Sequence, residues 1–549
     1  MLVTVRNKPS KLNAIVGFLV WAALFAIAYA QAPLYTSNQN QYFLHAYARL
    51  GYGYLDHDWL ANTLDPTPVF SELGYLTMRF LGLRELFYIY YALLMGIYLV
   101  SLLGIANEFW IGDRELENAK TPPPELSKDL ASDRGEVINS KWLALLGLLF
   151  LAHSAAWRFG LARLLGDNWS YIIEDGVADQ RMLGPVFQPS AFGVFLALSA
   201  ALFLRRKTYL AVLATGLAAI FHATYVLPSG MLTLAYMYVT WKEKRNPVET
   251  FLIGLVALLA VSPALYYAIN IFSATSPEAT SQARQILVEF RIPHHALISQ
   301  WLDATVAVKV SLISFALYLA RKRRLFWVLF IPAILSVILT LIQAITANLS
   351  LAILFPWRVS ILLVPLAVTV ILARIVEWLH KRMSSMPERC THLLAVASLG
   401  LIAMTVLVGA IRFSLDLERK SNLPERGLYH YVSLHKQTGE VFLIPVKMQD
   451  FRLETGAPVY IDFKSIPYQD NEIVEWYRRN QLANRFYHKP DCAMLPQLRI
   501  EGIDAIILPA NQTVDDCPGL KLDYQDEAYR LFSLVIPDYY SITSALQIP

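Results

Sequence analysis

Acidic and histidine side chains gather in the stretch that follows the first apolar segment of the chain. Positions 54–59 read YLDHDW and supply Asp56, His57 and Asp58 within three residues. If this run is extended, Asp56 and Asp58 point to the same side, because side chains repeat with a period of two along a strand. Two neighbouring carboxylates are suited to general-base catalysis, or to holding a divalent cation such as Mg²⁺ or Mn²⁺. We therefore take Asp56 and Asp58 as candidate catalytic residues and His57 as a candidate for substrate binding.

The same run also has a structural interpretation. Asp58 is placed to cap a short helix beginning at Trp59, because an Asp side chain accepts hydrogen bonds from the free N–H groups of a first helical turn. Asp65-Pro66 and Thr67-Pro68 then mark a turn into the next helix. Capping and catalysis are compatible, so both interpretations stay open.

Three further clusters combine charged, histidine and aromatic residues. Segment 169–188 places two aspartates at a helical spacing, so that they share one face, with an arginine close behind. Segment 291–296 reads RIPHHA, and paired histidines beside an arginine are suited to binding a phosphate. Segment 355–358 reads FPWR, whose arginine could clamp the phosphate of a lipid-linked substrate. The candidate substrate-binding residues are Asp175, Asp179, Arg181, Arg291, His294, His295, Trp357 and Arg358.

Each of these clusters also has a structural alternative. Segment 169–188 could be an amphipathic helix at the membrane interface. The histidine pair could have an interfacial structural role, and a zinc site would need further ligands that are not evident nearby. The arginine of FPWR could anchor to lipid headgroups, with the adjacent tryptophan in the aromatic belt of the membrane.

The composition indicates a polytopic membrane protein. The chain has 549 residues, of which 56% are hydrophobic and 16% are charged, whereas soluble domains carry about 25% charged residues. The net charge of +4 is too small for a nucleic-acid-binding surface, and the basic residues fall in short clusters between apolar runs. We therefore expect membrane lipid, and no nucleic acid, among the partners.

Apolar runs and basic loops together predict the topology. A span needs about 20 apolar residues, and Lys and Arg collect in cytoplasmic loops. These rules predict about eleven helices, with the N-terminus in the cytoplasm. The predicted spans are 12–30, 87–106, 142–156, 191–204, a tight pair within 209–241, 251–272, 304–320, 325–346, 359–378 and 393–413. A basic residue, Lys309, falls inside one span, where a charge either snorkels to the interface or faces a polar cavity, and we expect it to snorkel.

The predicted topology divides the chain into two domains. Residues 1–413 form a transmembrane domain with a first exoplasmic loop at 32–86 and a cytoplasmic loop at 107–141, and residues 414–549 form an exoplasmic domain. Apolar, β-branched runs at 440–446, 459–463 and 503–509, with helical composition at 470–484, predict a small α/β fold there. Cys492 and Cys517 lie in this domain, either bridged or as two buried thiols. All four polar clusters fall on the exoplasmic side, which favours a common site.

These features resemble the GT-C superfamily of membrane glycosyltransferases: an acidic first exoplasmic loop, about eleven spans and an exoplasmic α/β domain at the C-terminus. The runs DHDWLANTLDPTPVFS, ADQRMLGPVFQPSAFGVFL, FRIPHH and VYIDFKSIPYQDNEIVEWYRR look more closely like those of a cyanobacterial-type family of bacterial multi-pass membrane proteins whose biochemistry is uncharacterised. That closer resemblance covers most of the chain. The superfamily resemblance is one of architecture.

The GT-C resemblance implies transfer of a sugar from a polyprenyl-phosphate donor to a glycan, lipid or protein acceptor at the outer face of the bacterial inner membrane, with the C-terminal domain in the periplasm. It implies that Asp56 or Asp58 acts as base or metal ligand. Arg291, His294, His295 and Arg358 would hold the donor phosphate. The sequence departs from the superfamily pattern because no clear Asp-Asp or Asp-Glu pair follows the first helix, which leaves the metal requirement open.

Two other classes of function are compatible with the sequence. One is a transporter or flippase for a lipid-linked glycan, and the other is a non-catalytic membrane scaffold. Transporters tend to contain internal repeats and charges at the membrane midplane. We detect no repeat, and most charges lie outside the apolar runs, which favours the enzyme.

Overall fold

The structure is a computed structural model that describes residues 11–118, 134–383, 387–512, 514 and 517–535. The chain divides into two compact units. Unit 1 comprises Met1–Gln31, Phe87–Tyr267 and Leu287–Leu415, and unit 2 comprises Ala32–Leu86, Ala268–Ile286 and Asp416–Pro549. The predicted first loop, 32–86, therefore belongs to the same unit as the C-terminal region.

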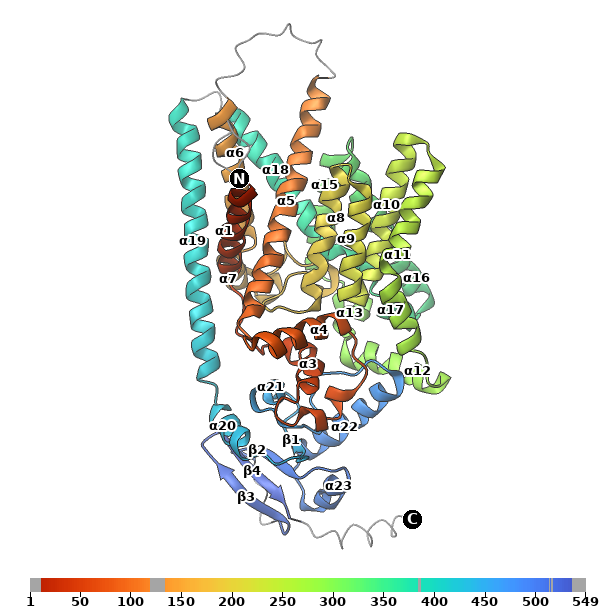
Figure 1. The fold of residues 1–549 in the computed structure, drawn as a ribbon, viewed down its shortest axis with the longest axis vertical. Coiled ribbons are helices and arrows are strands. Elements are labelled where there is room, and N and C mark those ends of the chain that lie inside the picture. The colour runs from red at the N-terminus through yellow and green to blue at the C-terminus, as the bar shows by residue number, and fades with distance from the viewer. Residues whose placement is uncertain (1–10, 119–133, 384–386, 513, 515–516, 536–549) are drawn as a thin grey trace. The chain divides into compact units, whose positions relative to one another are not determined.

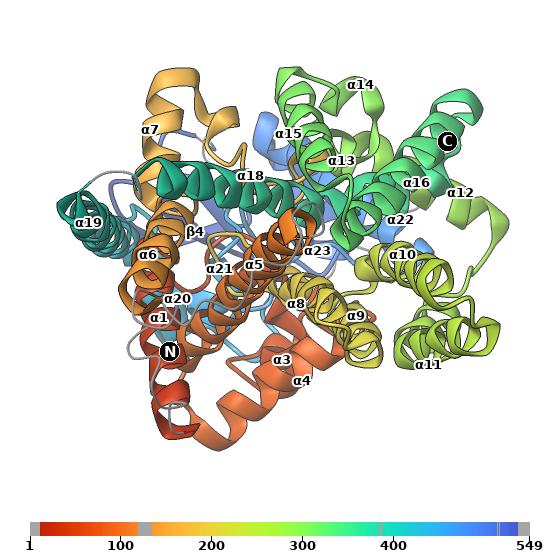
Figure 2. The ribbon, with the colours of Figure 1, turned by 90° about the horizontal axis from the view of Figure 1, so that it is seen from above.

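Unit 1 is helical in its described part (Figure 1). The helices that lie wholly or largely in it are α1 (Lys11–Tyr29), α5 (Leu86–Asn118), α6 (Arg134–Ala152), α7 (Ala155–Leu165), α8 (Val194–Leu204), α9 (Thr208–Phe221), α10 (Val226–Lys244), α11 (Pro247–Ile271), α13 (Pro293–Ala296), α14 (Ile298–Trp301), α15 (Ala304–Ala320), α16 (Arg324–Thr346), α17 (Leu349–Ile353), α18 (Ser360–Met383) and α19 (Glu388–Ser421). Helix α18 lies between α6 and α15 (Figure 2), and it is buried along most of its length.

Six apolar segments among the described residues are long enough to cross a membrane. They are Lys11–Tyr29, Leu86–Ile111, Pro247–Ile271, Arg324–Thr346, Leu349–Met383 and Arg389–Ser421. A seventh is added if α6 and α7, which meet at a bend of 53°, form one broken span. The predicted spans all fall on helices, and the predicted tight pair at 209–241 falls on α9 and α10. The helical positions are confirmed, and the count of eleven spans stays a prediction.

The predicted cytoplasmic loop at 107–141 is shorter in the structure. Helix α5 continues to Asn118, and α6 begins at Arg134. Both extensions contain Glu, Lys or Arg, so hydropathy marked them as loop although such residues are good helix formers. The prolines of this loop lie outside the described residues.

Short helices and turns connect the long helices of unit 1 near the polar clusters. They are η5 (Asp167–Trp169), η6 (Val177–Asp179), η7 (Pro189–Gly193), η8 (Ala223–Tyr225), η9 (Ile286–Arg291) and η10 (Pro356–Val359). Segment 169–188 is therefore a series of turns and not the single interfacial helix considered as an alternative. Asp175 and Asp179 do not share a helical face.

Unit 2 combines short helices with one sheet. Its helices and turns are α2 (Gln39–Tyr42), α3 (Leu44–Arg49), η1 (Leu55–His57), η2 (Leu60–Asn62), α4 (Pro68–Leu76), η3 (Thr77–Leu81), α12 (Pro277–Gln285), α20 (Arg426–His435), α21 (Phe451–Thr455), α22 (Asp470–His488), η11 (Cys492–Met494) and α23 (Leu495–Ile500). The small C-terminal α/β fold predicted from the sequence is confirmed.

The sheet has the order β1-β2-β4-β3. Strands β1 (Phe442–Leu443) and β2 (Ala505–Pro509) are parallel and joined through α21, α22 and α23, since parallel neighbours need a long crossover. Strands β3 (Leu520–Gln525) and β4 (Tyr529–Leu534) form an antiparallel hairpin that the sequence analysis missed. The predicted strand at 459–463 is wrong, because Val459 makes only an isolated bridge to Phe442.

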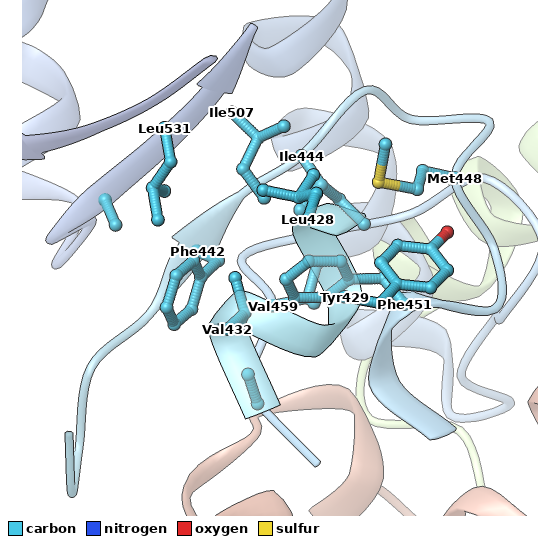
Figure 3. Close-up of a cluster of buried hydrophobic side chains, with 12 residues drawn as sticks. Leu428, Tyr429, Val432, Phe442, Ile444, Met448, Phe451, Val459, Ile507 and Leu531 are labelled. Atoms are coloured by element: carbon cyan, nitrogen blue, oxygen red, sulfur yellow. The ribbon is translucent and has the colours of Figure 1, made fainter. Parts of the chain in front are cut away.

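The core of unit 2 packs α20 and α21 against the sheet (Figure 3). Buried side chains from β1, β2 and β4 meet those of the two helices. Its labelled members are Leu428, Tyr429, Val432, Phe442, Ile444, Met448, Phe451, Val459, Ile507 and Leu531. A disulfide joins Cys492 to Cys517, which decides between the two alternatives left open for these cysteines.

Candidate functional site

Two adjacent buried acids stand at the centre of segment 169–188 in unit 1. The side chain of Glu174 is 4% exposed and lies 3.3 Å from Arg158 of α7. The side chain of Asp175 is 3% exposed, and both of its oxygens accept hydrogen bonds from Nε of Arg181, at 3.0 and 2.9 Å. Burial is the main cause that raises the pKa of Asp175 to about 7, although Arg181 and Lys309 oppose it. The carboxyl group of Asp175 can therefore gain or lose a proton near neutral pH.

The backbone after Asp175 is strained. Ala178 and Asp179 both have positive φ angles, of 60° and 51°, a conformation that costs residues with a Cβ atom of the order of 1 kcal/mol or more each. Gly176 packs so closely against Ser360 that a Cβ atom would collide with it. Strained, tightly held backbone of this kind is typical of functional sites.

Lys309 of α15 holds this turn. It is 2% exposed, and its Nζ atom donates a 2.8 Å hydrogen bond to the carbonyl oxygen of Gly176. The prediction that Lys309 snorkels to the interface is therefore wrong. A buried cation is stable where it finds both a hydrogen-bond acceptor and negative charge nearby, and the carboxylate of Asp175 interacts with it electrostatically.

The predicted histidine pair lies beside the same turn. The Nδ1 atom of His295 is 2.6 Å from the carbonyl oxygen of Ala178. A carbonyl only accepts, so Nδ1 carries the hydrogen and Nε2 is left as an acceptor. Burial, aided by His294, Arg291 and Arg358, lowers the pKa of His295 to about 3. His295 is therefore neutral at pH 7, which corrects the expectation of a cationic histidine, and Arg291 and Arg358 carry the positive charge.

The FPWR segment is the third predicted cluster in unit 1. Phe355 has a positive φ of 50°, and η10 follows it. The guanidinium of Arg358 lies over the ring of Tyr225, 5.2 Å from its centroid. The Nε of Arg358 and the Nε1 of Trp357 are buried and have no hydrogen-bond partner among the described residues. Two buried donors at one turn are a natural recognition element for an anion.

The structure joins three of the predicted clusters in unit 1. The backbone N–H of Val177 donates a 2.7 Å hydrogen bond to Oγ of Ser360, the first residue of α18. Trp357 packs against the buried cluster of Val177, Ala178, Trp301 and Val306. The unit 1 site consists of Asp175, Asp179, Arg181, Lys309, Arg291, His294, His295, Trp357 and Arg358, of which Asp179 and His294 are exposed.

The first-loop candidates lie in unit 2, and the structure separates the two aspartates. Residues 55–57 form the turn η1 and are not extended. The side chain of Asp56 is 55% exposed, 3.8 Å from His57. Asp58 is fully buried. Its oxygens accept hydrogen bonds from the N–H groups of Ala61 and Val459 and from Nε of Arg452.

Asp58 therefore has the capping role considered as its structural alternative, together with a buried ion pair. Asp56 and Asp58 do not fit a shared divalent cation, because one points outward and the other has both oxygens bonded within the protein. No group of three or more His, Cys, Asp or Glu side chains suited to a metal occurs in the part of the chain that the structure describes. We derive no catalytic step through a metal.

The sequence analysis missed two residues that contact the unit 1 site, Arg158 and Tyr225. Arg158 donates to His153 O, Tyr29 O and Glu174, and so joins the ends of α1 and α6 to the acidic turn. Its position within an apolar run was a usable signal, since a charge there needs a buried partner. Tyr225 had no comparable signal, because tyrosine is common at helix ends of membrane proteins.

The long apolar helices and the small sheet domain define a polytopic α-helical membrane protein. Residues 424–483, in unit 2, match the family model described as a domain of unknown function (DUF6798). No curated protein matches the sequence. Among solved structures, the chain is similar to ArnT from Cupriavidus metallidurans in the apo state, with 13% identity, a TM-score of 0.43 and coverage of 96% of this chain and 99% of that chain.

Proposed function

We propose that this protein is an integral-membrane glycosyltransferase that transfers a sugar from a polyprenyl-phosphate donor to an acceptor at the exoplasmic face. One observation carries the proposal: the turn with Asp175 and the turn with Arg358 are fixed to each other. The hydrogen bond from Val177 N to Ser360 Oγ makes this connection, and the hydrogen bond from His295 Nδ1 to Ala178 O holds the RIPHHA segment, with Arg291, against the same acidic turn. A buried carboxylate and buried cationic donors are thereby held in one site, as glycosyl transfer from a phosphate requires.

In this reaction an acceptor oxygen attacks the anomeric carbon of the donor sugar. The bond between that carbon and the phosphate oxygen breaks, and the phosphate leaves with the electron pair. Arg358 and Arg291 stabilise the leaving phosphate, since a charged donor is most effective where negative charge develops. Asp175 takes the proton of the acceptor, because a base with a pKa near the working pH is the most effective one.

Asp56 is the second candidate for the base, as expected from the sequence, since its carboxylate is exposed in the first loop. Asp58 is a weaker candidate, because its oxygens are bonded and buried. The disulfide between Cys492 and Cys517 favours an oxidising compartment for unit 2. We accordingly place the C-terminal domain in the periplasm and the N-terminus in the cytoplasm of a bacterial inner membrane.

A transfer assay tests the proposed function. The full chain is reconstituted in vesicles with a polyprenyl phosphate that carries labelled hexose, and release of the bare polyprenyl phosphate is measured with a periplasmic membrane extract as the acceptor source. We expect the Arg358→Gln variant to lower the rate about 10²-fold or more. Arg163→Gln, an exposed arginine at the end of α7, is the matched control and should leave the rate unchanged. A wild-type rate for Arg358→Gln would contradict the proposal.

A transporter of lipid-linked sugar is a second candidate, favoured by one observation. Helices α6 and α7 meet at a bend of 53°, and Arg158 of α7 forms a buried ion pair with Glu174. Broken helices with buried charges are typical of transporters. The same vesicles separate the two functions. A transporter would move the labelled lipid between leaflets without releasing bare polyprenyl phosphate.

A further inference from the structure

Five buried polar atoms without partners lie in the FPWR turn of unit 1 and in two segments connected to it, 176–180 and 188–190. Besides Nε of Arg358 and Nε1 of Trp357, they are Oε1 of Gln180, Oε1 of Gln188 and Oγ of Ser190. Gln180 is 2% exposed, and Gln188 and Ser190 are each 6% exposed. Buried polar atoms are nearly always hydrogen-bonded in folded proteins, because an unmade bond costs about 1–3 kcal/mol. Five such atoms in connected segments favour a polar ligand.

A shared contact with Tyr225 brings Ser190 close to Arg358. The hydroxyl of Tyr225 donates a 2.5 Å hydrogen bond to the carbonyl oxygen of Ser190. The guanidinium of Arg358 lies over the ring of the same Tyr225. Gln188 is two residues before Ser190 and directly precedes the turn η7, and its backbone carbonyl oxygen accepts a hydrogen bond from Ala191 N within that turn.

The kinds of atoms define the chemistry of the ligand. Arg358 Nε and Trp357 Nε1 can only donate, so they call for an acceptor such as a phosphate oxygen. The Oε1 atoms of Gln180 and Gln188 can only accept, so they call for hydroxyl donors. Ser190 Oγ can do either. A phosphate alone satisfies only the donors, and a neutral sugar alone leaves the arginine without an anion.

We infer that Gln188 and Ser190 form a subsite for the hydroxyl groups of a phosphorylated hexose whose phosphate is held at Arg358 and Trp357. This inference rests on the proposed function, and it names the sugar hydroxyls as the part of the donor that the site binds. Recognition of hydroxyls by buried groups is selective, because a ligand that lacks the hydroxyl leaves those groups unpaired. Gln180 belongs to the acidic turn, where Gly176 N donates to its carbonyl oxygen, and it extends the same subsite toward Asp175.

Binding measurements on the purified full chain test this inference. The probes are a short polyprenyl phosphate, the same lipid carrying glucose, and UDP-glucose, and their dissociation constants are measured by titration calorimetry in detergent. The wild-type protein should bind the glucosylated lipid at least about tenfold more tightly than the bare lipid. In Gln188→Leu and Ser190→Ala, most of the extra affinity for the glucosylated lipid should be lost. The dissociation constant for the bare lipid should change less than about twofold. Gln300→Leu, at an exposed glutamine, should behave as wild type.

The unliganded variants provide a check on folding. Replacing Gln188 by Leu removes no hydrogen bond of Oε1 within the protein, so its Tm without ligand should equal or exceed that of the wild type. A clear fall in Tm would show that Gln188 has a structural role and would overturn the subsite. Arg358→Gln should weaken binding of both lipids.

The remaining outcomes separate the subsite from the proposed function. If the wild type shows no gain for the glucosylated lipid, or if the gain persists in both variants, the subsite is wrong while the phosphate site stands. If UDP-glucose binds and both variants weaken it while neither lipid binds, the subsite is supported and the polyprenyl donor is wrong. If no probe binds, both are contradicted.

Discussion

The Nε atom of Arg452 lies 2.6 Å from a carboxylate oxygen of Asp58, although 394 positions separate the two residues in the chain. The same guanidinium is ion-paired with Asp462, and all three side chains are at most 2% exposed. Beside them, Tyr54 N donates a 2.8 Å hydrogen bond to Gly456 O, where Gly53 and Gly456 both have positive φ. The first loop is therefore built into unit 2 by residues that fall within the region matched by the family model.

Removal of Asp58 should destabilise unit 2. Asp58→Ala leaves Arg452 with one of its two buried carboxylates and Val459 N without an acceptor, so we expect a loss of about 3–5 kcal/mol. Thermal unfolding of the purified chain measures it. Asp56→Ala is the matched control, and it should leave Tm unchanged because its side chain is exposed. A stable Asp58→Ala protein that has lost only activity would contradict this account and restore Asp58 as a catalytic residue.

Asp175 should control the pH dependence of activity. Its pKa of about 7 in the folded protein is raised above the ordinary value of 3.8. Activity that needs the ionised form should therefore rise with pH through about 7. The stability that protonated Asp175 contributes is full below about pH 4 and is lost as pH rises through 7. Asp175→Asn should lower the transfer rate about 10²- to 10⁴-fold and flatten Tm against pH between 4 and 7.

The exposed Asp179 provides the control for Asp175. Asp179→Asn should keep the wild-type rise in activity near pH 7. An unchanged pH profile in Asp175→Asn would remove Asp175 from the reaction and leave Asp56 as the remaining candidate base.

Lys309 should position the acidic turn. Lys309→Met leaves the carbonyl of Gly176 without its donor, at a cost of about 1–3 kcal/mol. It also removes a positive charge that lowers the pKa of Asp175, so the rise in activity should move to higher pH. Transfer rates across pH 6–9 measure the shift. Lys322→Met, at an exposed lysine, should show neither effect, and a loss of rate in Lys309→Met without a shift would indicate a structural role alone.

The disulfide should stabilise the C-terminal part of unit 2. Cys492 and Cys517 close a loop with a sequence separation of 25, and loop-closure entropy gives about 3.5 kcal/mol for a loop of this size. Reductant, or the double change Cys492→Ser and Cys517→Ser, should lower the Tm of the full chain. Cys390→Ser should have no effect. Alkylation of Cys492 and Cys517 without reductant would contradict the bridge.

The helices and the polar clusters were predictable from the sequence because each depends on local pattern. Apolar runs such as 325–346 specify a helix in a membrane whatever their partners, and the RIPHHA and FPWR segments carry their chemistry in consecutive residues. The small α/β fold followed in the same way from the apolar run at 503–509. The hairpin of β3 and β4 was missed, because β3 is partly exposed and carries charges such as Lys521 and Asp523.

The roles of individual residues depended on partners that no local pattern contains. Asp56 and Asp58 look equivalent in sequence, and only the distant Arg452 distinguishes them. His295 looks cationic beside Arg291, and burial against Ala178 makes it neutral. Lys309 looks like a snorkelling residue in the sequence, but in the structure the carbonyl oxygen of Gly176 accepts its hydrogen bond. In each case the deciding group is contributed by another element of the fold.

A structure of the full chain with a bound glucosylated polyprenyl phosphate tests the central claim most directly. The account predicts density for the phosphate within hydrogen-bonding distance of the Arg358 guanidinium, with the sugar beside Gln188 and Ser190. The same map should show the carboxylate of Asp175 facing the position from which an acceptor would attack the sugar. Density for the phosphate away from Arg358, with this turn unchanged and the lipid bound elsewhere on the protein, would contradict it.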